Sequence, residues 1–196
     1  MLNRWMRRLA ALWMAAALAG AAQAAPASYP NPGTEAPPTA FSAGIDGVLV
    51  GYYTGEAGGF TNLAGALING SVGAIGLSNK TSAYGDRFVF GNVNAGDALV
   101  FFIDVLDTGD RFYSDEAMNA DGVNHTYSAV YAGDALVPSG VNLAFEDLFG
   151  GGDLNYRDHS WLIRIEAAVV PLTPTAALLA LGLLLMPVSV RARKSH

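Results

Sequence analysis

Short apolar runs alternate with Gly, Asn and Asp along the middle of the chain. They lie at Val48 to Thr54, on both sides of Asn69-Gly70, and at Arg87 to Val93, Ala98 to Leu106, His125 to Ala132, Val141 to Asp147 and His159 to Ala167. Each run is rich in β-branched and aromatic residues and is bounded by residues that favour turns, which is typical of strands. The pattern predicts roughly eight strands at the spacing of a sandwich.

Turn residues support the same fold class. Asn69-Gly70 stands between two apolar runs and predicts a two-residue hairpin, because both central positions of that turn need a positive φ. Asn94-Ala95-Gly96 predicts a further turn, and a helical pattern is limited to Asp115 to Ala120. We therefore expect residues 41–168 to form an all-β domain, an antiparallel β-sandwich or jelly roll.

The N-terminus has the organisation of a secretory signal peptide. Three arginines precede an apolar run from Leu9 to Ala19, and small residues follow at Ala22 and Ala24. This order predicts a signal helix in residues 1–24, removed on export. Residues 25–40 (APASYPNPGTEAPPTA) are rich in proline and lack periodicity, so we expect an extended linker there.

The last residues, 169–196, predict a C-terminal transmembrane helix, because an uncharged apolar run precedes Arg191, Arg193 and Lys194. A core helix that ends the chain is the alternative. The segment VVPLTPTAALLALGLLLMPVSVRARKSH resembles a PEP-CTERM sorting tail. That resemblance implies processing by an exosortase-type membrane protease in bacteria that make exopolysaccharide, with anchoring at or release from the cell surface. Leu172-Thr173 stands where the commonest motif has a glutamate.

Charge is distributed unevenly along the chain. Six of the eleven basic residues lie in the two terminal segments, which leaves five basic and seventeen acidic residues between them, a net charge of −12. Such a field argues against nucleic acid or anionic membrane surfaces as partners and favours cations, although acidity also keeps exported proteins soluble. The chain has no cysteine, so bound calcium would be a natural substitute for disulfides.

One stretch, FEDLFGGGDLNYRDHSW, places five oxygen-bearing side chains around three glycines just before the last predicted strand. Calcium takes 6 to 8 oxygen ligands, and a glycine-rich loop lets several point at one centre. A neighbouring stretch, SDEAMNADGVNH, offers two more. The predicted calcium ligands are Glu146, Asp147, Asp153, Asn155, Asp158, Asn119 and Asp121. The alternative is a tight, solvated loop in which Asp and Asn only form turns.

Three segments together resemble the domain of unknown function 4114 family: Ala95 to Val105, Ser114 to His125 and Phe145 to Ile165. That family occurs in exported bacterial proteins and has a motif of Phe-Glu-Asp, a glycine step and Asp-x-Asp-Tyr-x-Asp. Here Asn155 replaces the second aspartate and Arg157 precedes Asp158. The resemblance implies a β-rich extracellular module and supplies no reaction.

Catalytic motifs are sparse. The three histidines lack metal-ligand spacing and no nucleophile motif of the G-x-S-x-G type occurs. We therefore predict a non-catalytic, calcium-stabilised module with a structural or adhesive role at the cell surface or in the matrix, linked to exopolysaccharide or biofilm. The alternative is a secreted glycan-acting hydrolase that uses Glu146 with Asp153 or Asp158 as a carboxylate pair.

Overall fold

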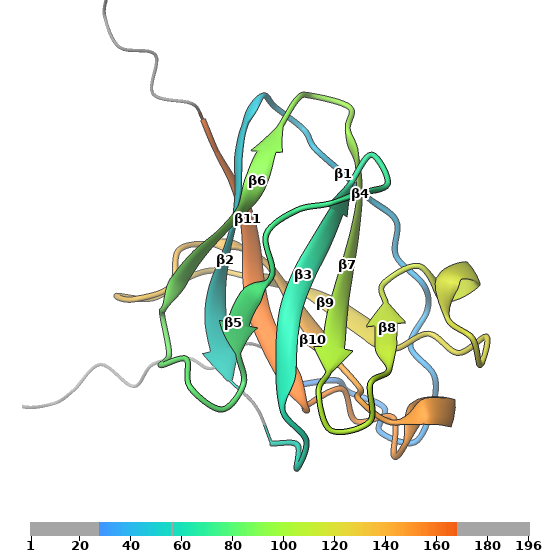
Figure 1. Cartoon of the computed structure of the whole chain (residues 1–196). Coiled ribbons are helices and arrows are strands. Elements are labelled where there is room, and N and C mark those ends of the chain that lie inside the picture. Colours follow the sequence, from blue (N-terminus) through green and yellow to red (C-terminus); the bar gives the residue numbers. More distant parts are fainter. Residues whose placement is uncertain (1–27, 56, 168–196) are drawn as a thin grey trace, which may run out of the picture.

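The computed structural model describes residues 28–55 and 57–167. These residues form mostly strands, arranged in two antiparallel sheets, and the helices among them are two single 3-10 turns, η1 (Glu116–Met118) and η2 (Phe149–Gly151). The predicted all-β class is therefore confirmed. Figure 1 shows β2, β3, β6, β7 and β11 running upright, β9 and β10 crossing behind them at an angle, and η1 and η2 on the right-hand side.

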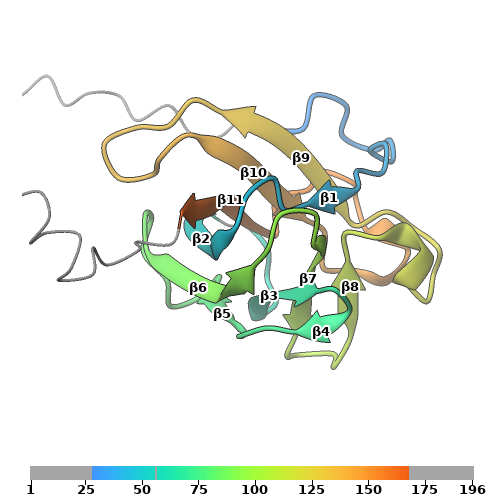
Figure 2. The ribbon, with the colours of Figure 1, turned by 90° about the horizontal axis from the view of Figure 1, so that it is seen from above.

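The two sheets have different sizes and orders. The strands are β1 (Phe41–Ser42), β2 (Gly47–Gly55), β3 (Asn62–Ile68), β4 (Ser71–Val72), β5 (Gly76–Ser78), β6 (Arg87–Val93), β7 (Ala98–Val105), β8 (Arg111–Tyr113), β9 (Thr126–Tyr131), β10 (Gly140–Phe145) and β11 (His159–Ala167). The first sheet has the order β1-β7-β3-β4, with β5 beside β3 and β8 beside β7; the second has the order β6-β2-β11-β10-β9. Figure 2 shows β9 and β10 on one side of the molecule and β3, β4 and β8 on the other.

One hydrophobic core joins the sheets. Side chains that point inward from β3 and β7, such as Ala64 and Phe101, pack with those from β10 and β11, such as Phe145 and Trp161, and all four are fully buried. The Phe145 and Trp161 rings stack with centroids 4.9 Å apart. Burial of this much apolar surface is the main force that holds two sheets together.

A strap of irregular chain, residues 28–40, lies against the second sheet. Tyr29 and Ala36 are buried, and the Tyr29 ring contacts the rings of Tyr127 and Tyr156, each with centroids 4.9 Å away. The Ala36 amide donates to the Tyr156 hydroxyl at 2.9 Å. This segment has no regular structure, turns at Asn31 to Thr34, and packs on the domain through specific contacts instead of forming the expected extended linker.

The strand pattern agrees closely with the sequence, and the turns add detail. Asn69 and Gly70 have φ of 49° and 77° and connect β3 to β4, which confirms the predicted hairpin. The turn at Asn94 to Asp97 instead passes from β6 in one sheet to β7 in the other. The short strands β1 and β8 were not expected, because two or three residues carry no periodicity.

The predicted helices at the two ends of the chain, in residues 1–24 and 169–196, lie outside the described residues. Within the described ranges, no helix has the length and apolarity needed to cross a membrane. The described chain begins in the strap and ends at the last residue of β11, Ala167, which pairs with Gly47 at the start of β2. Both predictions about the ends therefore stay predictions.

Candidate metal centre

The acidic loop, residues 146–158, connects β10 to β11 and curls tightly. Its three glycines, Gly150, Gly151 and Gly152, have φ of 79°, 82° and 52°, and two non-glycine residues, Leu154 and Tyr156, have φ of 50° and 54°. Side chains other than glycine adopt this left-handed conformation rarely and at a cost in energy. Such a conformation persists only where surrounding contacts fix it, and here those contacts centre on Glu146.

The loop wraps around the Glu146 carboxylate. The backbone amides of Asn155 and Tyr156 both donate to Glu146 Oε1, each at 2.6 Å. A Cβ on Gly152 would lie 3.0 Å from Glu146 Oε2, so a glycine leaves the room that this carboxylate needs. Successive amides that converge in this way form an anion-binding nest. Only 1% of the Glu146 surface is exposed.

Two further carboxylates adjoin Glu146. Asp158 lies close enough to Glu146 for the two carboxyl groups to interact electrostatically, and Asp158 Oδ2 accepts from the Asp147 amide at 3.1 Å. Burial, and then the charge of Asp158, raises the pKa of Glu146 to about 8. Burial, and then the charge of Asp147, raises the pKa of Asp158 to about 6. Carboxyl groups gathered in this way repel one another when ionised, and either a proton or a cation relieves that repulsion.

Sequence reasoning missed a fourth member of this cluster, Asn62, the first residue of β3. Its side chain is fully buried and its Nδ2 donates to Asp147 Oδ2 at 2.8 Å. Asn79 holds the Asn62 backbone in place, because its Oδ1 accepts from the Asn62 amide at 2.8 Å. A signal existed in the sequence, since Asn62 precedes Ala64 and Ala66 on the inward-facing side of the strand, where a polar residue is unusual.

Asp153 and Asn155 lie on the outer part of the loop. Asp153 is exposed, and its carboxylate accepts from the Asn155 side chain at 2.6 Å and from the Asn155 amide at 3.1 Å. Asn155 Oδ1 is a buried atom without a hydrogen-bond partner. The Asp153 and Asn155 side chains therefore bond to each other, while the Asn155 backbone amide donates to Glu146.

Asn119 and Asp121 belong to the neighbouring loop, residues 114–125, where they bond to protein groups. The Asn119 side chain accepts from the Tyr113 amide and donates to the carbonyls of Tyr113 and Val123, at 2.7 to 3.0 Å. Asp121 accepts from the Gly150 amide at 2.7 Å and contacts His125 Nε2 at 2.9 Å. Burial opposes ionisation of Asp121, yet these hydrogen bonds lower its pKa overall.

Two buried histidines flank the cluster. His125 stacks on Phe112 with ring centroids 3.9 Å apart, and its Nδ1 lies 3.0 Å from the Glu146 carbonyl oxygen. His159 is fully buried, and burial lowers its pKa to about 3. Neither ring nitrogen of His159 has a hydrogen-bond partner of good geometry. His125 therefore connects the two loops, and His159 stays neutral within the core.

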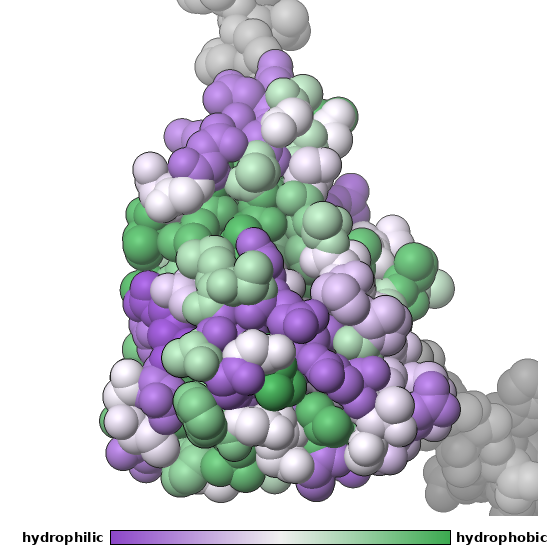
Figure 3. All heavy atoms as spheres, turned by 90° about the vertical axis from the view of Figure 1, so that its right-hand side faces the viewer, coloured by the Kyte–Doolittle hydropathy of each residue, from purple (hydrophilic) through white to green (hydrophobic). Residues whose placement is uncertain are grey.

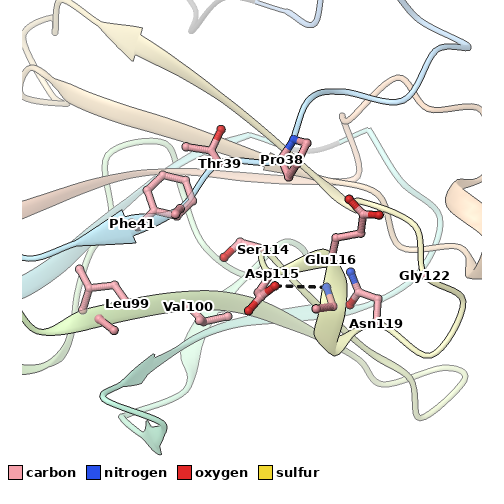
Figure 4. A pocket seen from close by; sticks show the side chains of 13 residues that line it. Pro38, Thr39, Phe41, Leu99, Val100, Ser114, Asp115, Glu116, Asn119 and Gly122 are labelled. Atoms are coloured by element: carbon pink, nitrogen blue, oxygen red, sulfur yellow. Dashed lines mark hydrogen bonds between the residues drawn. The ribbon is translucent and has the colours of Figure 1, made fainter.

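A groove of about 700 Å³ lies on the other side of the 114–122 segment. Its walls come from the strap near Phe41, from β7 at Leu99 and Val100, and from η1, with Asp115 and Glu116 at one end (Figure 4). Figure 3, which faces this side of the molecule, shows hydrophobic surface among hydrophilic residues. Glu146 and Asp158 do not line this groove.

The structure brings three of the seven predicted ligands together: Glu146, Asp147 and Asp158. In the part of the chain that the structure describes, no three side chains of His, Cys, Asp or Glu already converge on one point as metal ligands. The charge of Asp158 helps to raise the pKa of Glu146, the charge of Asp147 helps to raise the pKa of Asp158, and the loop that carries all three residues is glycine-rich. Small rearrangements of their side chains would be needed to enclose an ion.

No protein-family model, curated protein or solved structure matches the chain. The resemblances noted in the sequence, to the domain of unknown function 4114 family and to PEP-CTERM tails, therefore stay predictions. Any functional conclusion has to come from the residues and the geometry described above.

Proposed function

We propose that this chain is an exported protein whose β-sandwich domain binds calcium in its acidic loop and serves a structural or adhesive role at the cell envelope. The metal rigidifies the loops and takes no part in a reaction. The observation that carries the proposal is the group formed by the buried Glu146 and Asp147 and the half-buried Asp158, whose carboxylates gather at a curled glycine-rich loop. A hard divalent cation with oxygen ligands suits such a group.

The same geometry favours a structural role over catalysis. Carboxyl pairs in glycosidases stand roughly 5 to 9.5 Å apart beside an open cleft that admits the sugar. Glu146 is instead buried under the loop, with Asp158 close enough for its charge to raise the pKa of Glu146. A glycan-acting hydrolase is the alternative function, and it would have to open this loop before a substrate reached either carboxyl group.

Export and anchoring rest on the two terminal segments. In this proposal residues 1–24 direct secretion and residues 169–196 form a transmembrane helix that an exosortase-type protease processes, leaving the domain anchored at or released from the surface. The sequence supports it through the arginines before the first apolar run and the basic cluster after the last. A jelly-roll arrangement of the two sheets, and contact with exopolysaccharide, belong to the same proposal.

Thermal unfolding of the full chain in mild detergent tests the calcium proposal. The midpoint is measured in excess chelator, in millimolar calcium and in millimolar magnesium. An ion that binds only the folded state stabilises it by RT ln(1 + [L]/Kd), about 2.7 kcal/mol at a hundredfold excess over Kd, so the midpoint should rise by several degrees in calcium. Equal unfolding midpoints in calcium and in chelator would contradict the proposal.

Cell fractionation tests the rest of it. The tagged full chain should be found outside the cytoplasm, and a variant without residues 169–196 should leave the membrane fraction for the medium. Retention of the full chain in the cytoplasm would contradict export, and an unchanged distribution after the deletion would contradict anchoring by the tail.

A further inference from the structure

The cluster contains a buried oxygen that the protein itself leaves without a partner. Asn62 Oδ1 accepts no hydrogen bond, although the residue is fully buried and its Nδ2 donates to Asp147. A buried polar atom left unsatisfied costs about 1 to 3 kcal/mol. A 180° flip of the Asn62 side-chain amide would not satisfy Oδ1, because Oδ1 would then face a carboxylate oxygen of Asp147.

Neighbouring contacts hold the Asn62 backbone in place beside the acidic loop. Asn79 receives the Asn62 amide through its Oδ1 at 2.8 Å and donates from Nδ2 to the carbonyls of Phe60 and Asp158, at 2.9 and 3.3 Å. Asn62 and Asp147 lie 85 residues apart in the chain. The start of β3 is thereby held against the acidic loop, with the side chain of Asn62 directed into the carboxylate cluster.

We infer that Asn62 is a ligand of the calcium ion, and that the ion lies between the two sheets, held by Asn62 Oδ1 together with Glu146, Asp147 and Asp158. This inference rests on the proposed function and assigns it a specific place. Amide oxygens are ordinary calcium ligands, and one amide with three carboxylates gives a charged, oxygen-only set that water can complete. A cation there satisfies the Asn62 oxygen and neutralises the carboxylates at once.

The position of this site changes what the ion does. Asn62 belongs to the first sheet, whereas Glu146, Asp147 and Asp158 adjoin β10 and β11 of the second. A bound ion therefore cross-links the two sheets at one end of the core, a role that disulfides fill in many exported domains. Asn119, Asp121 and Asp153 contribute to the loops around it and do not contact the ion.

Calcium titration of the full chain in detergent, by calorimetry and by the calcium-dependent shift in the unfolding midpoint, tests this assignment. Asn62→Ala should weaken calcium binding by about tenfold or more, because one ligand is removed. Asn142→Ala is the matched control: Asn142 is also a buried strand asparagine, and its Oδ1 accepts from Thr54 at 2.7 Å, away from the cluster. It should lower stability and leave calcium affinity within about twofold of the parent.

Asn62→Asp separates a ligand from a merely structural amide. It keeps an oxygen in place and removes the donor to Asp147, so a ligand role predicts a less stable protein in chelator that calcium restores, with affinity at least equal to the parent. A structural role predicts that calcium restores nothing. If calcium stabilises the parent and Asn62→Ala binds calcium as tightly as the parent, the assignment of Asn62 as a ligand is wrong and the proposed function stands. If calcium does not stabilise the parent, both the assignment and the proposed function are wrong.

Discussion

Two acidic loops lie side by side in this molecule, and they use their carboxylates differently. In residues 114–125, Asn119 and Asp121 bond to backbone amides, backbone carbonyls and His125. In residues 146–158, Glu146 and Asp158 also accept hydrogen bonds from backbone amides, but burial and the charge of Asp158 raise the pKa of Glu146. The comparison teaches that acidic composition does not identify a metal site. A carboxylate is a candidate metal ligand where the protein does not already supply enough hydrogen-bond donors or positive charge to it.

The largest loss of stability should come from a substitution in residues 114–125, where the polar side chains already have hydrogen-bond partners in the protein. Asn119→Ala removes three hydrogen bonds to the backbone and leaves buried groups unsatisfied, so it should lower the free energy of unfolding by about 3 kcal/mol. The loss should be the same in calcium and in chelator. Chemical denaturation under both conditions measures it. A loss that calcium reverses would mean that Asn119 takes part in metal binding after all.

The second effect is a pH dependence that belongs to the other loop. In chelator, the free energy of unfolding should fall by about 2 kcal/mol between pH 6.5 and pH 8, because the raised pKa of Glu146, about 8, means that the folded chain binds more protons than the unfolded chain in that range. His159, with a pKa of about 3, is neutral in both states there and adds nothing.

Glu146→Gln isolates this contribution. The variant keeps the shape of the side chain and cannot ionise, so its stability in chelator should stay nearly constant from pH 6.5 to pH 8. Denaturation series at several pH values, for parent and variant, give the comparison. A parent curve that rises with pH in chelator would show that the carboxyl cluster is compensated by the protein and has no need of a cation.

The sequence predicted the strands and the acidic loop because both signals are local. Alternation of apolar residues identifies a strand from its own residues, and Asn69-Gly70 identifies its turn in the same way. Ligand convergence is different in kind. Asn62 reaches Asp147 from 85 residues away, while Asn119 and Asp121, which have the right chemistry, are occupied by backbone groups that only the folded loop brings near.

The strap shows the same limit. Its prolines predict an extended linker, but the chain turns at Asn31 to Thr34, and only 7% of Tyr29 and 1% of Ala36 is exposed. The sequence APASYPNPGTEAPPTA does not predict what Tyr29 packs against, because Tyr127 and Tyr156 lie on other segments far along the chain. Composition predicts the absence of regular structure, and it does not predict whether an irregular segment packs.

A third, smaller effect should come from Tyr156, which joins the strap to both loops. Its hydroxyl accepts from the Ala36 amide at 2.9 Å and donates to the Asn124 carbonyl at 3.0 Å. Tyr156→Phe keeps the ring contacts and should cost about 1.5 kcal/mol through these two bonds. Hydrogen exchange of residues 28–40 should become faster in the variant. Unchanged exchange there would mean that the aromatic contacts alone hold the strap.

The smallest effect should come from a carboxylate that already has a protein cation beside it. Asp104 receives Arg111 through two bonds at 2.5 and 2.8 Å, and both side chains are partly exposed. Asp104→Asn should therefore cost less than about 1 kcal/mol, and the cost should shrink in 1 M salt, because a pair in contact with solvent is screened. Calcium should not change it. A smaller stabilisation of Asp104→Asn than of the parent by calcium would mean that paired surface carboxylates also contribute to metal binding. The contrast between the two acidic loops would then no longer explain which carboxylates hold the ion.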